Sequence, residues 1–287
     1  MKHTAKNTQT NHTAAPLENT RAAYRADWAH YTSWCRRCGA TPIPPDAGLI
    51  AQYLTSCAAP QDGTPAFAVS TIERRLAGLL WQFAQRGVPL DRNASALAPV
   101  LADIRRQNTR PPKQKAALQP DDISAMVATL SYSLRDLRDR AILLLGFAGG
   151  LRRSEITAID VNRDDTADGK GWLTISGAQL ILTFHEKTEP RKIEITRGPT
   201  DEACPVHAVE QWLRYAKISS GPLFQRVTRD NLKPTGARLS DKHVVRLIKR
   251  TVRDGGIRSD LPEAERLALF SGHSFRDGAS NLSADGS

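Results

Sequence analysis

The sequence has 287 residues, of which 40% are hydrophobic and 24% are charged, as in a globular protein long enough for two domains. Its longest apolar run, residues 141–147, is much too short to span a bilayer, and the polar residues 1–16 do not resemble a secretory signal. Four scattered cysteines do not form a disulfide framework. We therefore expect a cytoplasmic protein without a membrane partner.

The net charge of +10 is unevenly distributed along the chain. Residues 1–117 carry 15 Lys and Arg against 7 Asp and Glu, whereas residues 118–287 carry 25 against 23. A basic segment joined to a balanced one indicates a polyanionic partner, and nucleic acid is the commonest. The alternative is that the charge serves only solubility, and composition alone does not separate the two.

Residues 1–15 are expected to form a disordered tail, and residues 16–107 show the patterns of an all-helical domain. A helix is predicted from Thr20, as its cap, to the stop at Gly39. Residues 69–87 predict another, because Ser70 and Glu73 have the spacing of a capping box ahead of an apolar stripe. Segments 46–58 and 96–107 predict two further helices, separated by proline-rich turns.

Basic residues of this domain and of the segment after it are candidate DNA contacts. Residues 108–117 are interpreted as a basic linker, because two prolines oppose a helix there and no acid occurs between Ile104 and Gln119. The segment could lie along a phosphate backbone, or it could be a solvated hinge. The candidates are Arg74, Arg75, Arg105, Arg106, Arg110, Lys113 and Lys115.

The pair Cys35 and Cys38 has the spacing of half a zinc site. The sequence offers no second pair at a recognisable spacing, and both cysteines fall within a helical pattern. We expect structural thiols and no metal.

Residues 118–287 begin with helical patterns and then change period. The runs 172–176, 179–184 and 191–196 are rich in β-branched and aromatic residues and predict a small antiparallel sheet, with residues 185–190 as a turn. Helical patterns return at 204–216 and 241–256. The predicted fold is mostly α with a small antiparallel β-sheet.

The helix predicted at 241–256 carries basic residues on one side and apolar residues on the other. The basic stripe consists of Lys242, Arg246, Lys249, Arg250 and Arg253. A helix that contacts a row of DNA phosphates would carry such a stripe, and Lys242 and Arg246 are the candidate DNA contacts. The alternative is an ordinary solvated face.

Three short motifs contain residues able to grip a phosphate. Arg152 lies in "GGLRRSEI", at a tight turn where an arginine more often pairs with a carboxylate such as Glu155. Lys187 lies at the tip of the predicted hairpin, in "HEKTEPRKIEI". His273 and Arg276 lie in "SGHSFRDGA". Each signal is weak when taken singly.

Taken in order, the three motifs resemble the tyrosine recombinase family, the phage-type integrases. They are similar to its first arginine box, its lysine hairpin and its His-x-x-Arg box. The resemblance covers nearly all of the chain: residues 16–107 look like the helical (SAM-like) core-binding domain, and residues 118–287 like the catalytic domain. It implies a protein of a mobile element that binds double-stranded DNA in the bacterial nucleoid. In the family, DNA strand transfer proceeds through a 3′-phosphotyrosyl intermediate.

The resemblance also implies roles for four residues. Arg152 and Arg276 would grip the non-bridging oxygens of the scissile phosphate, where negative charge grows during transfer. Lys187 would protonate the departing 5′-hydroxyl as a general acid, and His273 would hydrogen-bond the phosphate or assist proton transfer. Neither ATP nor a divalent ion nor any other cofactor is implied.

In the family, the nucleophilic tyrosine lies downstream of the His-x-x-Arg box. The five tyrosines of this chain, at positions 24, 31, 53, 132 and 215, all precede it. We therefore expect a chain truncated before its nucleophile, which binds DNA and does not cleave it alone. The alternative is a non-catalytic DNA-binding regulator, or an inhibitory partner of a full-length recombinase. Other recombinase protomers on the same DNA are further candidate partners.

Overall fold

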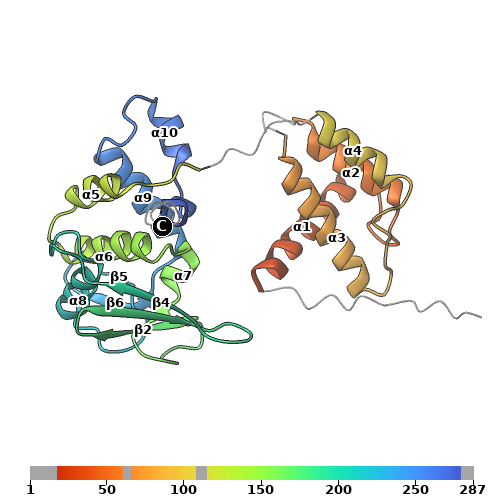
Figure 1. Ribbon diagram of the computed structural model, residues 1–287. Helices are drawn as coiled ribbons and strands as arrows, with labels where there is room; N and C mark the ends of the chain where they lie inside the picture. The colour runs from red at the N-terminus through yellow and green to blue at the C-terminus, as the bar shows by residue number, and fades with distance from the viewer. Residues whose placement is uncertain (1–17, 61–65, 108–114, 279–287) are drawn as a thin grey trace, which may run out of the picture. The chain divides into compact units, whose positions relative to one another are not determined.

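The computed structural model describes residues 18–60, 66–107 and 115–278 (Figure 1). The chain divides into two compact units, Met1–Pro111 and Pro112–Ser287, and the division falls inside the predicted linker. The predicted tail and the candidates Arg110 and Lys113 lie outside the described residues.

The described part of the first unit is helical. Its helices are α1 (Glu18–Arg37), α2 (Ala47–Ala58), α3 (Val69–Gln85) and α4 (Leu97–Gln107). Their apolar faces close on one core, in which Tyr31, Tyr53, Leu76 and Phe83 are completely buried. The buried stripe of α3 follows the predicted periodicity of 3.6 residues.

Two predicted helix caps are wrong. Helix α1 begins at Glu18, so Thr20 lies within its first turn. The N-cap of α3 is Ala68, which provides no capping side chain, and Ser70 lies inside the helix. Packing of its apolar stripe stabilises α3 without a cap, as is usual for helices in proteins. Helix α2, in contrast, is capped by Asp46, whose carboxylate accepts hydrogen bonds from the first turn.

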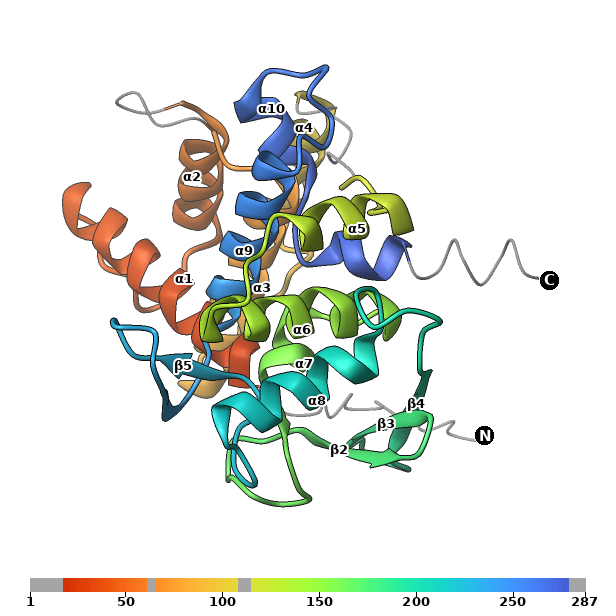
Figure 2. The same cartoon turned by 90° about the vertical axis from the view of Figure 1, so that its left-hand side faces the viewer.

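The second unit is built around one buried helix. Its described helices are α5 (Pro120–Ala128), α6 (Leu134–Ala148), α7 (Arg153–Thr157), α8 (Pro205–Ala216), α9 (Asp241–Asp254) and α10 (Glu263–Leu269). Every residue of α6 from Leu137 to Phe147 is buried, and α8 packs alongside it (Figure 2). Trp212 of α8 is fully buried and donates its indole N–H to the carbonyl oxygen of Leu223 at 2.7 Å.

The sheet beside these helices is small and mixed. Its strands are β1 (Ile159–Asp160), β2 (Gly171–Ser176), β3 (Gln179–Phe184) and β4 (Arg191–Thr196), in the order β1-β2-β3-β4. Strands β2, β3 and β4 are antiparallel as predicted, but β1 pairs with β2 in parallel. A separate pair is formed by β5 (Gln225–Val227) and β6 (Pro234–Arg238). The predicted class, mostly helical with a small sheet, is confirmed, and the sheet's purely antiparallel character is corrected.

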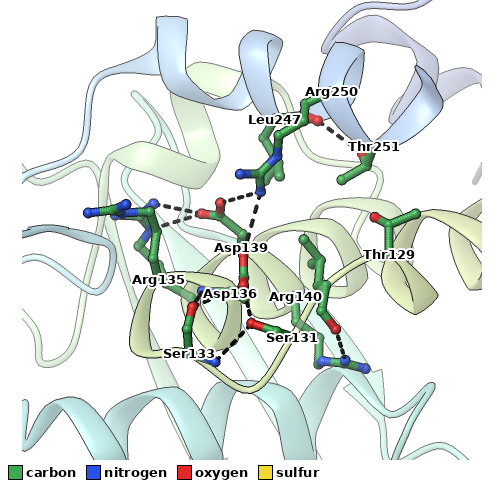
Figure 3. Close-up of polar contacts among 12 residues, drawn as sticks. Thr129, Ser131, Ser133, Arg135, Asp136, Asp139, Arg140, Leu247, Arg250 and Thr251 are labelled. Carbon is green, nitrogen blue, oxygen red and sulfur yellow. Dashed lines mark hydrogen bonds and ion pairs between the residues drawn. The ribbon is translucent and has the colours of Figure 1, made fainter. Parts of the chain in front are cut away.

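A buried carboxylate joins α6 to α9. Asp139, which is 1% exposed, accepts a hydrogen bond from the adjacent Arg138 at 2.7 Å. It also contacts Nε2 of His243 at 3.1 Å. Nη2 of Arg250 donates to Asp139 at 3.0 Å (Figure 3). Burial alone would raise the pKa of Asp139, but the hydrogen bond with His243 and the charge of Arg138 lower it below its usual value. Asp139 is therefore ionised, and Arg250 of the basic stripe is directed to it.

Replacing Asp139 tests how strongly this contact holds α6 and α9 together. Asp139→Asn leaves the buried Arg138 facing a neutral amide, so we expect the free energy of unfolding to fall by roughly 3–5 kcal/mol in urea denaturation. The control Asp260→Asn removes an exposed partner of Arg258 and should change stability little. Equal stability of the two variants would contradict this role.

The pH dependence of stability follows from the depressed pKa of Asp139. Such a group contributes stability at pH values above its unfolded pKa of about 3.9, and this contribution disappears as the pH falls through the folded pKa. Urea denaturation from pH 6 down to pH 3 should therefore show a smaller loss of stability in Asp139→Asn than in the unmodified protein.

Candidate functional site

Arg152 lies at the junction of α6 and α7. Gly149 ends α6, and Gly150 has a φ of +55°, which turns the chain sharply. Arg152 is the N-cap residue of α7; its backbone N–H donates to Glu155 Oε2 at 2.8 Å, and its Nη1 donates to Oε1 at 2.9 Å. The carboxylate partner considered for this arginine is therefore present. Because 52% of the Arg152 side chain is exposed, the guanidinium is both held and accessible.

The same carboxylate connects α7 to the β3–β4 hairpin. Arg191, at the start of β4, donates from Nη2 to Glu155 Oε1 at 2.6 Å and from Nε to Glu186 Oε1 at 2.9 Å. Lys187, which follows Glu186 in the sequence, is exposed and makes no hydrogen bond or ion pair with any residue that the structure describes. An available ammonium group therefore lies next to a chain of polar contacts that ends at Arg152.

Residues 273–278 are helical and pack on α6 and α7. Phe275 is fully buried against Gly146 of α6, where an added Cβ would lie 3.0 Å from its ring. That Cβ would also lie 2.8 Å from Cδ1 of Ile156, so the ring is close to α7 as well. His273 and Arg276, on either side of this anchoring ring, are exposed.

A second contact brings the His-x-x-Arg motif to the first arginine motif. A Cβ added to Gly272 would lie 3.0 Å from Cβ of Arg153, so a side chain at position 272 would crowd Arg153. The residue before His273 thus packs directly on the residue after Arg152. All three motifs are therefore gathered around α7.

The two candidates on α3 differ in their surroundings. Arg75 is 7% exposed; its Nη1 donates to the Tyr53 hydroxyl at 2.9 Å, and its guanidinium lies 4.1 Å from the centre of the Phe67 ring. Position 75 borders the buried stripe at 72, 76 and 79, which explains its burial. Its position does not suit a phosphate contact. Arg74 is 43% exposed and forms an ion pair with Asp27.

The candidates around the linker are exposed but have partners. Arg105 pairs with Glu73, and Arg106 pairs with Asp103 at 2.8 Å. Lys115 donates from Nζ to the carbonyl oxygen of Ala268 at 2.6 Å, which fastens the start of the second unit's described segment beside α10. A DNA phosphate would compete with these contacts.

The exposed face of α9 agrees with the predicted basic stripe except at Arg250. Lys242, Arg246 and Lys249 are exposed and make no hydrogen bond or ion pair within the described ranges. Arg253 pairs with the adjacent Asp254. One helix face thus carries three cations that have no counter-charge in the described part of the chain.

Sequence reasoning missed Arg191, which links the lysine hairpin to α7. Its pairing with Glu155 spans 36 residues, and no spacing rule indicates a contact of that kind. Its position four residues after Lys187 was the only available signal.

Among the described residues, no group of three or more His, Cys, Asp or Glu side chains could hold a metal ion. Cys35 and Cys57 are buried thiols, and Cys38 is exposed. None of the helices in the described ranges is long and apolar enough to cross a bilayer.

Replacing Glu155 tests the connection between α7 and the hairpin. Glu155→Ala removes the cap of α7 and both arginine contacts, so we expect a loss of about 1–2 kcal/mol in unfolding free energy. Hydrogen exchange should become faster in residues 152–158 and 185–196. Glu194→Ala, an exposed position on β4, is the matched control; equal exchange in the two variants would show that Glu155 does not connect the motifs.

Comparison with known proteins agrees with the order of the three motifs. Residues 116–287 match the Phage integrase family, more than half of the chain. The chain is 29% identical over 276 residues to an integrase/recombinase xerD homolog from Selenomonas ruminantium, covering 93% of this chain and 74% of that protein. It is 25% identical over 201 residues to tyrosine recombinase XerC from Pseudomonas fluorescens, covering 68% and 57%.

A solved structure, the crystal structure of XerA recombinase, is also similar, with 14% identity, a TM-score of 0.40, and coverage of 91% of this chain and 85% of that one. On the family match over residues 116–287, the chain belongs to the phage integrase family of tyrosine recombinases.

Proposed function

We propose that this recombinase-family chain binds duplex DNA and that its second unit holds one backbone phosphate between Arg152, Lys187, His273 and Arg276. The observation that carries the proposal is the gathering of the three motifs around α7. Glu155 links Arg152 to the lysine hairpin, and Gly272 and Phe275 pack the His-x-x-Arg segment on α7 and α6.

The chemistry of phosphoryl transfer requires these residue types. Negative charge grows on the non-bridging oxygens, and two arginines can grip them while staying charged at any physiological pH. Glu155 orients Arg152 without burying it. Lys187 has no partner among the described residues, which supports its role as proton donor to the 5′-hydroxyl. His273 donates a further hydrogen bond to the phosphate.

We propose further that a polypeptide of these 287 residues forms no covalent link to DNA by itself. All five tyrosines precede His273 in the sequence. Tyr31 and Tyr53 are buried, and burial raises the pKa of each phenol, which opposes formation of the nucleophilic phenolate. Tyr132 precedes α6 whereas Arg152 follows it, and a helix of 15 residues is about 22 Å long.

The position of the tyrosines also favours a second candidate function. A protomer that occupies recombinase sites without cleaving would act as a regulator or an inhibitory partner on DNA. Adding this chain to an active recombinase that shares its target would then slow strand exchange in proportion to the sites it occupies. Unchanged strand exchange at saturating chain would exclude this role.

Binding of duplex DNA is the first expected outcome. Affinity should fall steeply with salt, because bound cations release condensed counterions from the duplex. Lys242→Ala should lower the slope of log K against log salt by about 0.9, the value for one phosphate contact. Arg214→Ala, an exposed charge on α8, is the control and should leave the slope unchanged. Affinity that is equal at low and high salt would contradict DNA binding of this kind.

Absence of a covalent product is the second expected outcome. Incubation with a suicide substrate, a duplex nicked near the cleavage position, should yield no protein–DNA adduct stable to denaturation. The same sample must show DNA binding, so that lack of reaction is not lack of contact. A trapped adduct would overturn the proposal, and peptide mapping would then identify the attacking residue.

A further inference from the structure

A second group of basic side chains lies near the beginning of α6, whereas Arg152 follows its end. A pocket of about 260 Å³ is formed there by α6, β5 and the start of α9. Four arginines and a histidine line it, and none of the lining residues in the described part of the chain is acidic. The basic residues are Arg135, Arg138, Arg226, His243 and Arg246.

Two of these arginines are fixed in place by the protein. Arg138 is 2% exposed and donates to Asp139 and, at 3.1 Å, to the carbonyl oxygen of Gln225. Arg135 donates from Nη2 to the carbonyl oxygen of Thr228 at 3.0 Å. The pocket therefore has a rigid, positively charged inner wall.

The other two arginines have no counter-charge among the residues that the structure describes. Arg226 and Arg246 are exposed, and neither makes a hydrogen bond or ion pair with any residue in the described ranges. The nearest buried carboxylate, Asp139, is already shared by Arg138, His243 and Arg250. The pocket consequently holds more positive charge than the surrounding protein neutralises.

The beginning of α9 adds to this positive potential. Ser240, its N-cap residue, lines the pocket, and its side chain makes no capping hydrogen bond to the helix. The amide groups of the first turn of a helix carry partial positive charge and favour a bound anion. Here they reinforce a pocket that the arginines already define.

We propose that this pocket binds a phosphate group and that, in the DNA complex, it seats one backbone phosphate outside the site around Arg152. Arginine forks bind phosphate oxygens in pairs, which suits the free guanidinium groups of Arg226 and Arg246. Since about 15 Å³ of such volume is enough to hold one water molecule, a pocket of about 260 Å³ has room for a phosphate group. The DNA part of this inference rests on the proposed function, but the affinity for phosphate does not.

The phosphate in this pocket must differ from the one at Arg152. Arg138 lies ten residues before the last residue of α6, a distance of about 15 Å along the helix. That distance corresponds to roughly four base-pair steps of 3.4 Å. One duplex could therefore occupy both sites with different phosphates of its backbone.

The test uses the full chain and the double variant Arg226→Ala/Arg246→Ala, with Arg214→Ala as the matched control. Calorimetric titration with inorganic phosphate, at constant ionic strength and without DNA, should show saturable binding to the unmodified chain. We expect affinity at least tenfold weaker in the double variant and unchanged in the control. Both substituted residues are exposed, so the variant should fold, and its circular dichroism spectrum and melting temperature should match the control.

Duplex binding across a range of salt concentrations identifies the source of the phosphate. If both arginines hold one DNA phosphate, the double variant lowers the salt slope by about 0.9 rather than twice that value. If the double variant loses phosphate binding but its DNA affinity keeps the same salt slope, the pocket binds free phosphate and not a DNA phosphate. If the chain binds phosphate in this pocket but does not bind DNA, the proposed function is wrong and the phosphate site is still supported. Phosphate binding that is absent, or equal in variant and control, would overturn the pocket.

Discussion

The buried carboxylate of Asp139 is the contact on which the arrangement of the second unit depends. One negative charge, almost inaccessible to solvent, is shared by Arg138 of its own helix and by His243 and Arg250 of α9. Taking such charges out of water is costly unless each finds a partner, so α9 can pack on α6 in few ways. The exposed cations of α9 and the pocket at its start are thereby fixed to the same helix that ends just before Arg152.

Glu155, which lies closer to the surface, is likewise a carboxylate shared by several cations. It binds Arg152 and Arg191, two cations from elements distant in the sequence, while leaving Arg152 half exposed. A carboxylate shared by two arginines orients them without cancelling their combined charge. The second unit therefore presents oriented, incompletely neutralised arginines in two places, and a phosphate group is the natural complement of both. This common principle connects the site around α7 with the pocket at α9.

Much of this architecture could be predicted from local pattern. Strong periodicity gave α3 and α9 correctly, and alternation gave the three long strands and the hairpin that carries Lys187. The two-residue β1 is too short to show any period, so its parallel pairing with β2 was missed. The three-residue β5 of the separate pair was missed for the same reason. Ser70 has the spacing of a cap but lies inside its helix, because side-chain burial fixes where α3 begins.

Contacts between distant residues could not be predicted, since one sequence gives no sign of them. The sequence predicts a surface cation at Arg75, whereas the packing of α1, α2 and α3 buries it. Arg226 attracted no attention because its partners in the pocket lie on α6 and α9. The order of the three motifs, in contrast, could be read from the sequence, and the family that it suggested is confirmed by the match over residues 116–287.

In the proposed DNA complex, Arg152 and Arg276 hold the same phosphate. A double-mutant cycle on duplex affinity, with Arg152→Ala, Arg276→Ala and the two changes together, tests it most directly. If the two side chains share one phosphate, the cycle should give a coupling free energy of about 0.5 kcal/mol or more. Losses of binding free energy that simply add would mean that the two arginines contact DNA independently, and would contradict the account.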